Sequence, residues 1–163
     1  MISHSTLVRR AERWLLNQGC AFALTELVVI ISPGEIPDAI GWNGSTSTIL
    51  VECKISRADF LADQKKSIRR DPIWGLGRYR YYLCPKGMLQ AEEMPEGWGL
   101  LWAYPKQVRK IKESEYFEDT EWQAGLKNEI KMLISVIRRA YLRGLLPEIC
   151  APLVVSEGGS NAE

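Results

Sequence analysis

The sequence has one histidine, four cysteines and almost no net charge, and each shortage argues against a class of protein. The single histidine, His4, lies near the start of the chain and is a poor candidate for a catalytic base or a metal ligand. The cysteines stand far apart with no C-x-x-C spacing, so neither a zinc site nor a disulfide framework is indicated, and a reducing cytoplasm suits them. A net charge of +1 means that any nucleic-acid surface must be local.

Long hydrophobic runs are also lacking. No apolar run reaches the roughly 18 residues of a membrane span, and the first residues lack the apolar centre of a signal peptide, so we expect a cytoplasmic protein with no membrane partner. The 163 residues, 46% of them hydrophobic, suit one globular core. We expect a single domain over residues 1–146, with a core at 1–105, a C-terminal helix at 120–144 and a flexible tail at 147–163.

The segment from Thr48 to Lys54 predicts a buried strand that carries two charged side chains. Its β-branched and apolar residues are typical of a strand. Because side chains alternate between the two faces, Glu52 and Lys54 share a face with Leu50, while Cys53 points to the other face. Charged groups in such a strand are costly unless they are paired or used.

The preceding segment, residues 36–42, predicts the partner strand of a hairpin. A polar five-residue turn separates the two segments. If all five residues form the loop, Trp42 pairs with Thr48, and Asp38 lies directly opposite Glu52. Opposed side chains have Cβ atoms about 4.5–5.5 Å apart, so the two carboxylates would be neighbours.

A shorter turn would give a different register. Asn43-Gly44 could form a two-residue turn, which would pair Asp38 with Ile49 and separate it from the other carboxylate. We favour the five-residue loop because the serines and threonine that follow Gly44 are poor inward-facing residues. A β-bulge could also intervene.

Two opposed carboxylates and an amine suit metal-dependent phosphodiester hydrolysis. The carboxylates repel unless one takes up a proton or a cation lies between them. Mg²⁺ is typically held by one or two carboxylates together with water and substrate phosphate. Lys54 could orient or deprotonate a bound water and offset charge in the transition state. The competing interpretation is a solvated sheet face with an incidental Glu52–Lys54 pair.

Asp38, preceded by proline, and the Glu52-Cys53-Lys54 run resemble the P-D…(D/E)-x-K signature of the restriction-endonuclease-like nuclease superfamily. Residues 51–104 also resemble small MmcB-like proteins of bacteria and phages, linked by name to DNA repair. The resemblance implies an α/β fold, with a central mixed sheet of about four to five strands flanked by helices and a long C-terminal helix. It further implies a Mg²⁺- or Mn²⁺-dependent deoxyribonuclease of DNA repair or phage DNA metabolism, with Asp38, Glu52 and the Cys53 carbonyl as metal ligands.

Two further glutamates are candidates for an additional ligand. Residues 5–18 predict the first helix, and in many relatives a glutamate of that helix completes the metal site, which points to Glu12. Glu26, on an apolar face of a strand predicted over residues 22–31, competes with it. Surface roles for both glutamates stay open, and Glu35, beside a turn, is expected on the loop surface.

A basic helix follows the predicted site. Ser56 and Asp59 form a capping-box pattern that predicts a helix from Arg57 to the break at Asp71. Its N-terminus would favour a phosphate near Lys54. The predicted DNA-tracking residues are Arg57, Lys65, Lys66, Arg69 and Arg70, with Gln64 resembling the helix glutamine of RecB-like relatives. The alternative is a solvated helix face whose basic residues pair with acidic neighbours.

Two more strands are predicted downstream. In the first, residues 78–84, Arg78 and Arg80 share a face and could grip a nucleic-acid backbone, although a strand with one wet face explains them equally well. Residues 97–104 predict the last strand. The charged residues 106–119 then indicate a linker or a mobile flap.

A capping-box pattern at residues 120–123 opens a long helix that closes at about Arg143 before a glycine. Five apolar residues at helical spacing are expected to pack inward: Leu126, Ile130, Leu133, Ile137 and Tyr141. Lysines and arginines bias its remaining surface positive.

Taken together, the sequence predicts a nuclease that acts on DNA, with RNA as an open possibility. It leaves room for a homodimer or a protein partner. The alternative function is a catalytically silent nuclease-fold module that binds nucleic acid or a protein partner, such as a phage-encoded inhibitor.

Overall fold

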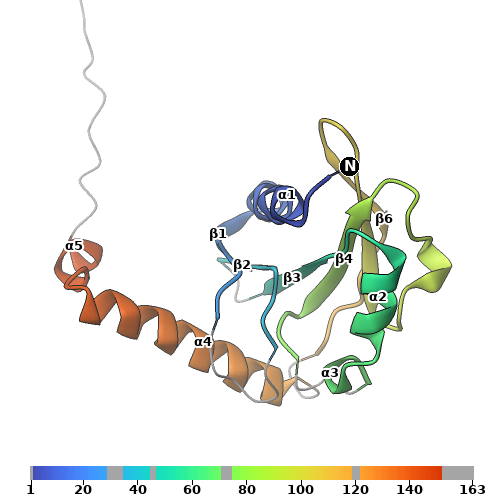
Figure 1. The fold of residues 1–163 in the computed structure, drawn as a ribbon. Helices are drawn as coiled ribbons and strands as arrows, with labels where there is room; N and C mark the ends of the chain where they lie inside the picture. Colours follow the sequence, from blue (N-terminus) through green and yellow to red (C-terminus); the bar gives the residue numbers. More distant parts are fainter. Residues whose placement is uncertain (1, 29–34, 45–46, 71–74, 119–121, 152–163) are drawn as a thin grey trace, which may run out of the picture.

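The computed structural model describes residues 2–28, 35–44, 47–70, 75–118 and 122–151, except the side chains of Ser67 and Arg70. A six-stranded sheet forms its centre (Figure 1). The strands are β1 (Cys20–Thr25), β2 (Ala39–Asn43), β3 (Thr48–Cys53), β4 (Tyr79–Pro85), β5 (Trp98–Ala103) and β6 (Val108–Lys112). The helices are α1 (His4–Asn17), α2 (Arg57–Gln64), α3 (Ser67–Arg70), α4 (Gln123–Leu142) and α5 (Leu146–Cys150), with a short 3₁₀ helix η2 (Ala91–Glu93).

The strands lie side by side in the order in which they occur along the chain. β1, β2 and β3 form an antiparallel meander, β3, β4 and β5 run parallel, and β6 returns antiparallel to β5. The connection from β3 to the parallel β4 passes through α2 and α3, as parallel neighbours require a crossover. This mixed sheet with flanking helices confirms the predicted α/β class.

The predicted number of strands was too low because β6 was taken for a linker or flap. β6 is a short edge strand of sequence VRKIK, and its residues are exposed or only half-buried. Edge strands commonly carry charged side chains, which hide the alternation that identifies a strand in the sequence. Hydrogen bonds to β5, with Trp102 opposite Arg109, rather than hydrophobicity, define this strand.

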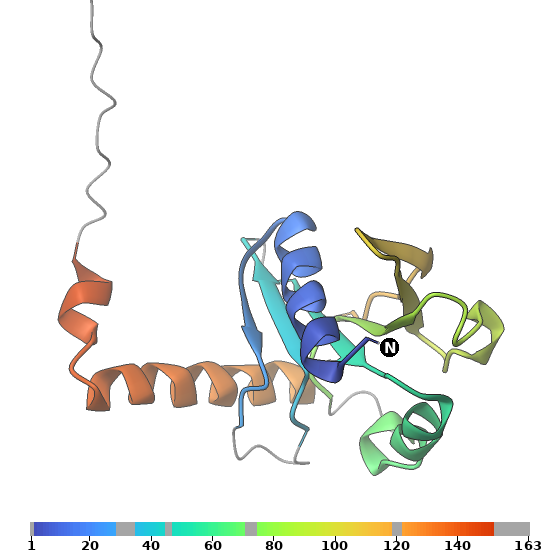
Figure 2. The same cartoon turned by 45° about the horizontal axis from the view of Figure 1, so that its top comes forward.

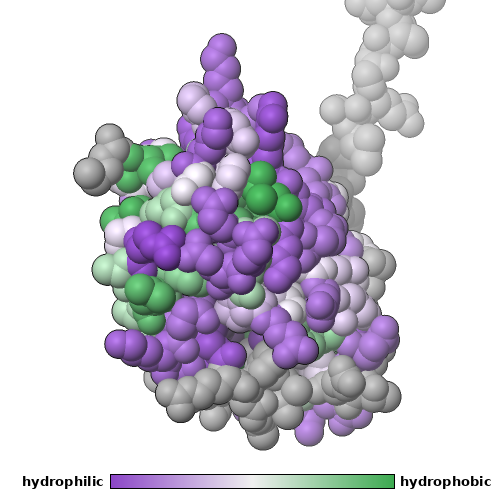
Figure 3. Space-filling view, turned by 90° about the vertical axis from the view of Figure 1, so that its right-hand side faces the viewer, coloured by the Kyte–Doolittle hydropathy of each residue, from purple (hydrophilic) through white to green (hydrophobic). Residues whose placement is uncertain are grey.

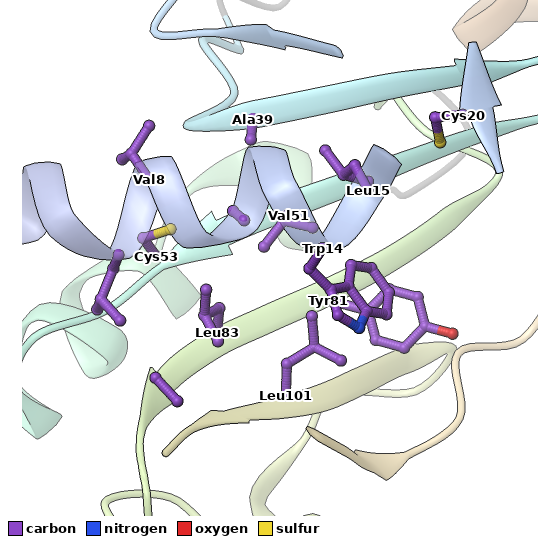
Figure 4. Packing of buried hydrophobic residues seen from close by; sticks show 13 residues of the cluster. Val8, Trp14, Leu15, Cys20, Ala39, Val51, Cys53, Tyr81, Leu83 and Leu101 are labelled. Carbon is purple, nitrogen blue, oxygen red and sulfur yellow. The ribbon is translucent and has the colours of Figure 1, made fainter. Parts of the chain in front are cut away.

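Helix α1 covers one face of the sheet. Its buried residues Leu7, Ala11 and Leu15 pack with Val51, Cys53 and other residues of β3, β4 and β5 (Figure 4). Trp14 meets Tyr81 edge to face, with ring centroids 5.3 Å apart. The helix begins slightly earlier than predicted, because Ser3 caps it by accepting a hydrogen bond from the Thr6 amide.

The opposite face of the sheet carries a second core, to which α2 and α4 contribute. Phe60 of α2 and Met132 of α4 belong to this core, together with Leu50. Tyr82 stacks on Trp98, with ring centroids 4.4 Å apart. The sheet therefore lies between two apolar layers, and the side chains of β3 divide between them as the alternation predicts.

The basic helix predicted after Lys54 is divided into α2 and α3. The Ser56 hydroxyl accepts a hydrogen bond from the Asp59 amide, so the predicted start is confirmed. The chain turns at Lys65, where α2 ends. This turn allows Arg69 of α3 to reach back to Asp63 of α2.

Helix α4 packs against the sheet with a different face from the one predicted. Four of the five apolar residues expected to point inward are exposed: Leu126, Ile130, Ile137 and Tyr141. The buried residues are instead Gly125, Asn128, Glu129 and Met132. Glu129 accepts hydrogen bonds from the Thr48 hydroxyl and the Gly77 amide, and these two bonds orient the helix.

The segment predicted as a flexible tail includes a further short helix, α5, and residues 152–163 lie outside the described part of the chain. Residues 120 and 121 of the predicted capping box also lie outside it. Among the described residues, no helix is both long and apolar enough to cross a membrane.

Candidate active site

The register of the β2–β3 hairpin is the one that brings Asp38 to Glu52. Trp42 pairs with Thr48 and Ala39 with Val51, so continuing the ladder by one residue places Asp38 opposite Glu52. Asp38 itself immediately precedes β2, and its Oδ2 accepts a hydrogen bond of 2.7 Å from the Cys53 amide. The side chain is thus held at the end of β3.

Glu52 and Lys54 are both almost fully buried at the end of β3, with 3% and 4% of their surface exposed. The Lys54 ammonium lies 3.2 Å from Oε2 of Glu52 and 3.4 Å from Oδ1 of Asp63. Their shared orientation follows from strand alternation, as predicted. The surface pair of the competing interpretation is therefore a buried pair in this structure.

Arg69 joins the remaining acidic groups around Glu52. Its guanidinium nitrogens lie 2.5 Å from Glu35, 2.7 Å from Asp63 and 3.1 Å from Oε1 of Glu52. The guanidinium also lies over the ring of Trp98, 4.8 Å from its centroid. Predicted as a DNA contact, Arg69 is a buried residue that offsets carboxylate charge, because only 9% of its surface is exposed.

Burial and neighbouring charges shift the pKa values of both Glu52 and Lys54. Burial raises the pKa of Glu52 to about 7, assisted by the carboxylates of Asp38 and Glu35 and opposed by Arg69 and Lys54. Although burial by itself would lower the pKa of Lys54, the neighbouring carboxylates, led by Glu52, raise it. Lys54 is therefore a charged ammonium at neutral pH.

Asp63 and Tyr82 extend the network beneath Lys54. The Tyr82 hydroxyl donates a hydrogen bond of 2.7 Å to Asp63, and the Gln64 amide donates one of 3.0 Å to the same hydroxyl. Burial alone would raise the pKa of Asp63, but hydrogen bonds and charge from Arg69 and Lys66 hold it below its usual range. Sequence reasoning missed both Asp63 and Glu35 as members of the site: Asp63 entered only as an acidic neighbour in the alternative of a solvated helix face, and Glu35 was expected on the loop surface.

His4 is a further neighbour that the sequence did not indicate. Its Nε2 lies 3.3 Å from Oδ1 of Asp38, and its Nδ1 lies 3.9 Å from Glu26. Glu26 adopts a φ of 47°, a left-handed backbone conformation that few residues other than glycine take. The sequence carries no signal for this contact, because His4 and Asp38 lie on separate elements far apart in the chain.

Asp38, Glu52 and Lys54 form the candidate trio, and of the two candidates for an additional ligand Glu26 is the one beside it, with its amide donating a hydrogen bond to the Asp38 carbonyl. Glu12 is half-buried on α1, eight residues beyond His4, which corresponds to about 12 Å of helix rise. His4, not Glu12, is therefore the α1 residue next to Asp38. Among the described residues, no group of three or more histidine, cysteine and acidic side chains is arranged to hold a metal ion.

The predicted nucleic-acid residues of α2 and α3 divide into exposed and buried ones. Lys65 and Lys66 are exposed, and Lys66 also lies 2.6 Å from Asp63. Arg57 is exposed but paired with Glu93. Gln64 is half-buried against Tyr82, and the side chain of Arg70 lies outside the described part of the structure.

Arg78 and Arg80 do not belong to an exposed surface, which corrects their prediction as DNA contacts. Arg80 has 1% of its surface exposed, and burial lowers its pKa to about 10. Its guanidinium lies 4.6 Å from the ring centroid of Phe117, and that of Arg78 lies 4.9 Å from that of Trp122. Both arginines support the packing between the sheet and the segments that follow β6.

Comparisons with known proteins bear on the fold. No model of a known protein family matches the chain, and no curated protein sequence matches it. Among solved structures, the chain is similar to SPO1766, a protein of unknown function from Silicibacter pomeroyi, with a TM-score of 0.62 and 20% identity. The match covers 94% of this chain and 98% of that chain. At this identity the similarity shows a shared fold, so any statement about activity rests on the site residues themselves.

Proposed function

We propose that this protein is a Mg²⁺- or Mn²⁺-dependent nuclease that hydrolyses phosphodiester bonds in DNA. The observation that carries the proposal is the position of Asp38 opposite Glu52, with the Lys54 ammonium 3.2 Å from Glu52. These three residues also occur in the order and spacing that resemble the signature of the restriction-endonuclease-like superfamily. The proposal extends to RNA as a second substrate class for the same site.

The donor atoms of the site suit a hard divalent cation. Asp38 and Glu52 supply carboxylate oxygens, and the Cys53 carbonyl and Glu26 are the candidates for further ligands. Among the described residues, Oε1 of buried Glu52 accepts no hydrogen bond, although the Arg69 guanidinium lies 3.1 Å away, so a cation bound there would share this oxygen with Arg69. Mg²⁺ needs few protein ligands, since water and substrate phosphate complete its shell, and a cluster of three acidic residues is not required. A bound cation would polarise the scissile phosphate and lower the pKa of a bound water.

Lys54 would act through its charge. The carboxylates around it favour the protonated ammonium, so it is suited to hold a water by donating hydrogen bonds and to offset negative charge on the phosphate. Proton abstraction by Lys54 would first require loss of its own proton. We therefore assign Lys54 an orienting and electrostatic role, with Arg69 and Asp63 holding its surroundings in place.

The substrate would approach over the exposed side of α2 and the turn that follows it. Lys65 and Lys66 are exposed there, and Arg57 stands at the start of α2. The chain as a whole carries a net charge of only +1, so this local group supplies the attraction for a polyanion. Arg69, Arg78 and Arg80, being buried, have no place in the proposed contact surface.

A cleavage assay on single-stranded, double-stranded and branched DNA tests the proposal. Metal-dependent cleavage should be lost in Glu52→Gln and Lys54→Met proteins, whereas Lys127→Gln, an exposed change on α4, should cleave like the wild type. Mn²⁺ binding by calorimetry should weaken at least tenfold in Glu52→Gln, which corresponds to about 1.4 kcal/mol. Folded wild-type protein that neither cleaves any of the DNA substrates nor binds Mn²⁺ would refute the proposal of a nuclease.

A catalytically silent binding module is the second candidate, and the pairing of Glu52 favours it. Lys54 and Arg69 both lie within ion-pair distance of Glu52, and the Cys53 amide occupies one oxygen of Asp38. Carboxylates that are already engaged in ion pairs and hydrogen bonds can have a purely structural role. Such a protein would bind DNA or a protein partner with equal affinity in the presence of Mg²⁺ and of a chelator.

A further inference from the structure

The outward side of α4 carries an apolar stripe that nothing in the described part of the chain covers. Each of its five large side chains exposes between 41% and 67% of its surface. They are Leu126, Ile130, Ile134, Ile137 and Tyr141. Monomeric proteins rarely expose contiguous apolar patches larger than a few hundred Å². A stripe that runs along most of a 20-residue helix therefore calls for a partner.

The stripe is separate from the face that α4 packs against the sheet. At about 100° of rotation per residue, the five positions of the stripe fall within a sector of about 80°. The buried residues of the same helix centre about 150° away from that sector. These buried residues are Gly125, Asn128, Glu129 and Met132. One side of the helix therefore packs against the core, and a second, apolar side faces outward.

The position of α4 leaves room for a second helix. Figures 1 and 2 show α4 leaving the sheet and running out beyond the body, with α5 at its far end. Leu145 and Ile149 continue the exposed apolar surface at that end. The face of the molecule over β6 and α2 is in contrast largely hydrophilic, with only small separate apolar areas (Figure 3). Of the 15 large apolar side chains that are exposed among the described residues, eight lie on α4, on α5 or between them.

We propose that two copies of this chain pair through the stripe, α4 against α4. No charged side chain of α4 falls within the stripe, and Lys127, Lys131 and Arg138 lie beside it, where they stay in water when two helices meet. A seam of about 80° matches the contact between two helices. A lipid surface would need a broader apolar face on the helix, so the width of the stripe favours a helical partner over a membrane.

The exposed area suits a stable dimer. Together with Leu145 and Ile149, the stripe makes seven exposed apolar side chains. At on the order of 100 Å² each, they would bury about 700 Å² per copy, within the range of one side of a standard protein interface. A second copy carries the same stripe at the same length, so the two stripes can cover each other. Symmetric pairs of this kind are the commonest oligomers of soluble proteins.

Sedimentation equilibrium of the full chain tests the pairing. The wild type should have twice the mass of one chain at micromolar concentration, and Ile134→Glu should shift it to the mass of one chain. Ile134→Lys should do the same, because the loss of apolar contact, not the sign of the charge, breaks the interface. Lys131→Gln lowers the net charge by one, as Ile134→Glu does, and should leave the dimer intact. Circular dichroism should show the same helix content in all four proteins.

Three results would overturn the proposal. The first is a wild type that stays monomeric at micromolar concentration. The second is a dimer that persists in both Ile134 variants, which would place the interface elsewhere. The third is a monomer that binds vesicles containing anionic lipid through α4, which would assign the stripe to a membrane surface. None of these measurements depends on nuclease activity, so they are independent of the proposed function.

Discussion

The backbone amide of Cys53 donates a hydrogen bond of 2.7 Å to the Asp38 carboxylate, and this contact ties the start of β2 to the end of β3. The Asp38 side chain is thus held in place by the main chain of β3, the strand that also carries Glu52. Asp38 consequently has two roles that can be separated. One oxygen stabilises the hairpin end, while the charge of the carboxylate faces His4 and Glu52.

Asp38→Asn and Asp38→Ala should differ in stability but not in activity. An amide oxygen can still accept the hydrogen bond from Cys53, so Asp38→Asn should unfold close to the wild type. Asp38→Ala should lose about 1–3 kcal/mol, because the bond to a charged acceptor disappears. Both variants should lose Mn²⁺ binding and cleavage under the proposed function. Urea unfolding and calorimetry measure the two effects, and equal stability of the two variants would show that the Cys53 bond contributes nothing.

Arg69 and Lys66 both pair with Asp63 but should differ strongly in their contribution to stability. The side chain of Arg69 is 2% exposed and faces three carboxylates, so Arg69→Met should cost about 3–5 kcal/mol by leaving buried charge uncompensated. The side chain of Lys66 is 59% exposed, and Lys66→Met should cost less than about 1 kcal/mol. Urea unfolding of the two variants gives the comparison, and similar losses for both would contradict the buried network.

Glu129 should make stability fall as pH rises through the neutral range. Burial raises its pKa from 4.5 to about 7, against the opposing hydrogen bonds from Gly77 and Thr48. The folded state thus binds the proton more tightly than the unfolded state, so this stabilisation is complete below about pH 4.5 and is lost as pH rises through about 7. The loss for this one group is on the order of 3 kcal/mol.

Glu129→Gln isolates this effect, because glutamine keeps an acceptor for the same two donors and does not titrate. The free energy of unfolding, measured at about pH 5 and about pH 8, should fall more in the wild type than in the variant. Glu52 titrates in the same range but is present in both proteins, so its contribution cancels. An identical pH dependence in the two proteins would rule out the raised pKa of Glu129.

Lys65 should contribute to DNA affinity through phosphate contact. It is exposed on the segment between α2 and α3, so Lys65→Ala should weaken binding uniformly across sequences. The slope of log K against log salt should decrease in magnitude by about 1, because one fewer counterion is released. Fluorescence anisotropy in Ca²⁺ at several salt concentrations measures this slope. Lys127→Ala on α4 is the control, and an equal effect of both changes would indicate nonspecific attraction.

Local pattern was sufficient to predict the hairpin and its trio. The alternation along β3 has a period of two, so Glu52 and Lys54 had to share a face. The polar composition of the turn then favoured the loop that pairs Trp42 with Thr48. Both are short-range properties of the chain, and the structure confirms them.

The surroundings of the trio could not be predicted in this way. His4 lies on α1 and Arg69 on α3, and although Glu35 is close to Asp38 in sequence, nothing in its local context shows that it pairs with Arg69. Arg80 lies in β4 and Arg78 immediately before it, and the segments that cover both side chains are far along the chain. Burial of a charged residue depends on what packs over it, which local sequence does not contain.

Helix α4 shows the same division between sequence and tertiary structure. The spacing of Leu126, Ile130, Ile137 and Tyr141 by itself determined that these residues form one apolar stripe, because helical periodicity decides which residues share a face. Only the tertiary structure decided that the stripe faces outward, since hydrogen bonds from Thr48 and Gly77 to Glu129 turn a different side of the helix to the sheet. Periodicity relates residues within a helix, whereas the direction in which a face points depends on contacts with the rest of the chain.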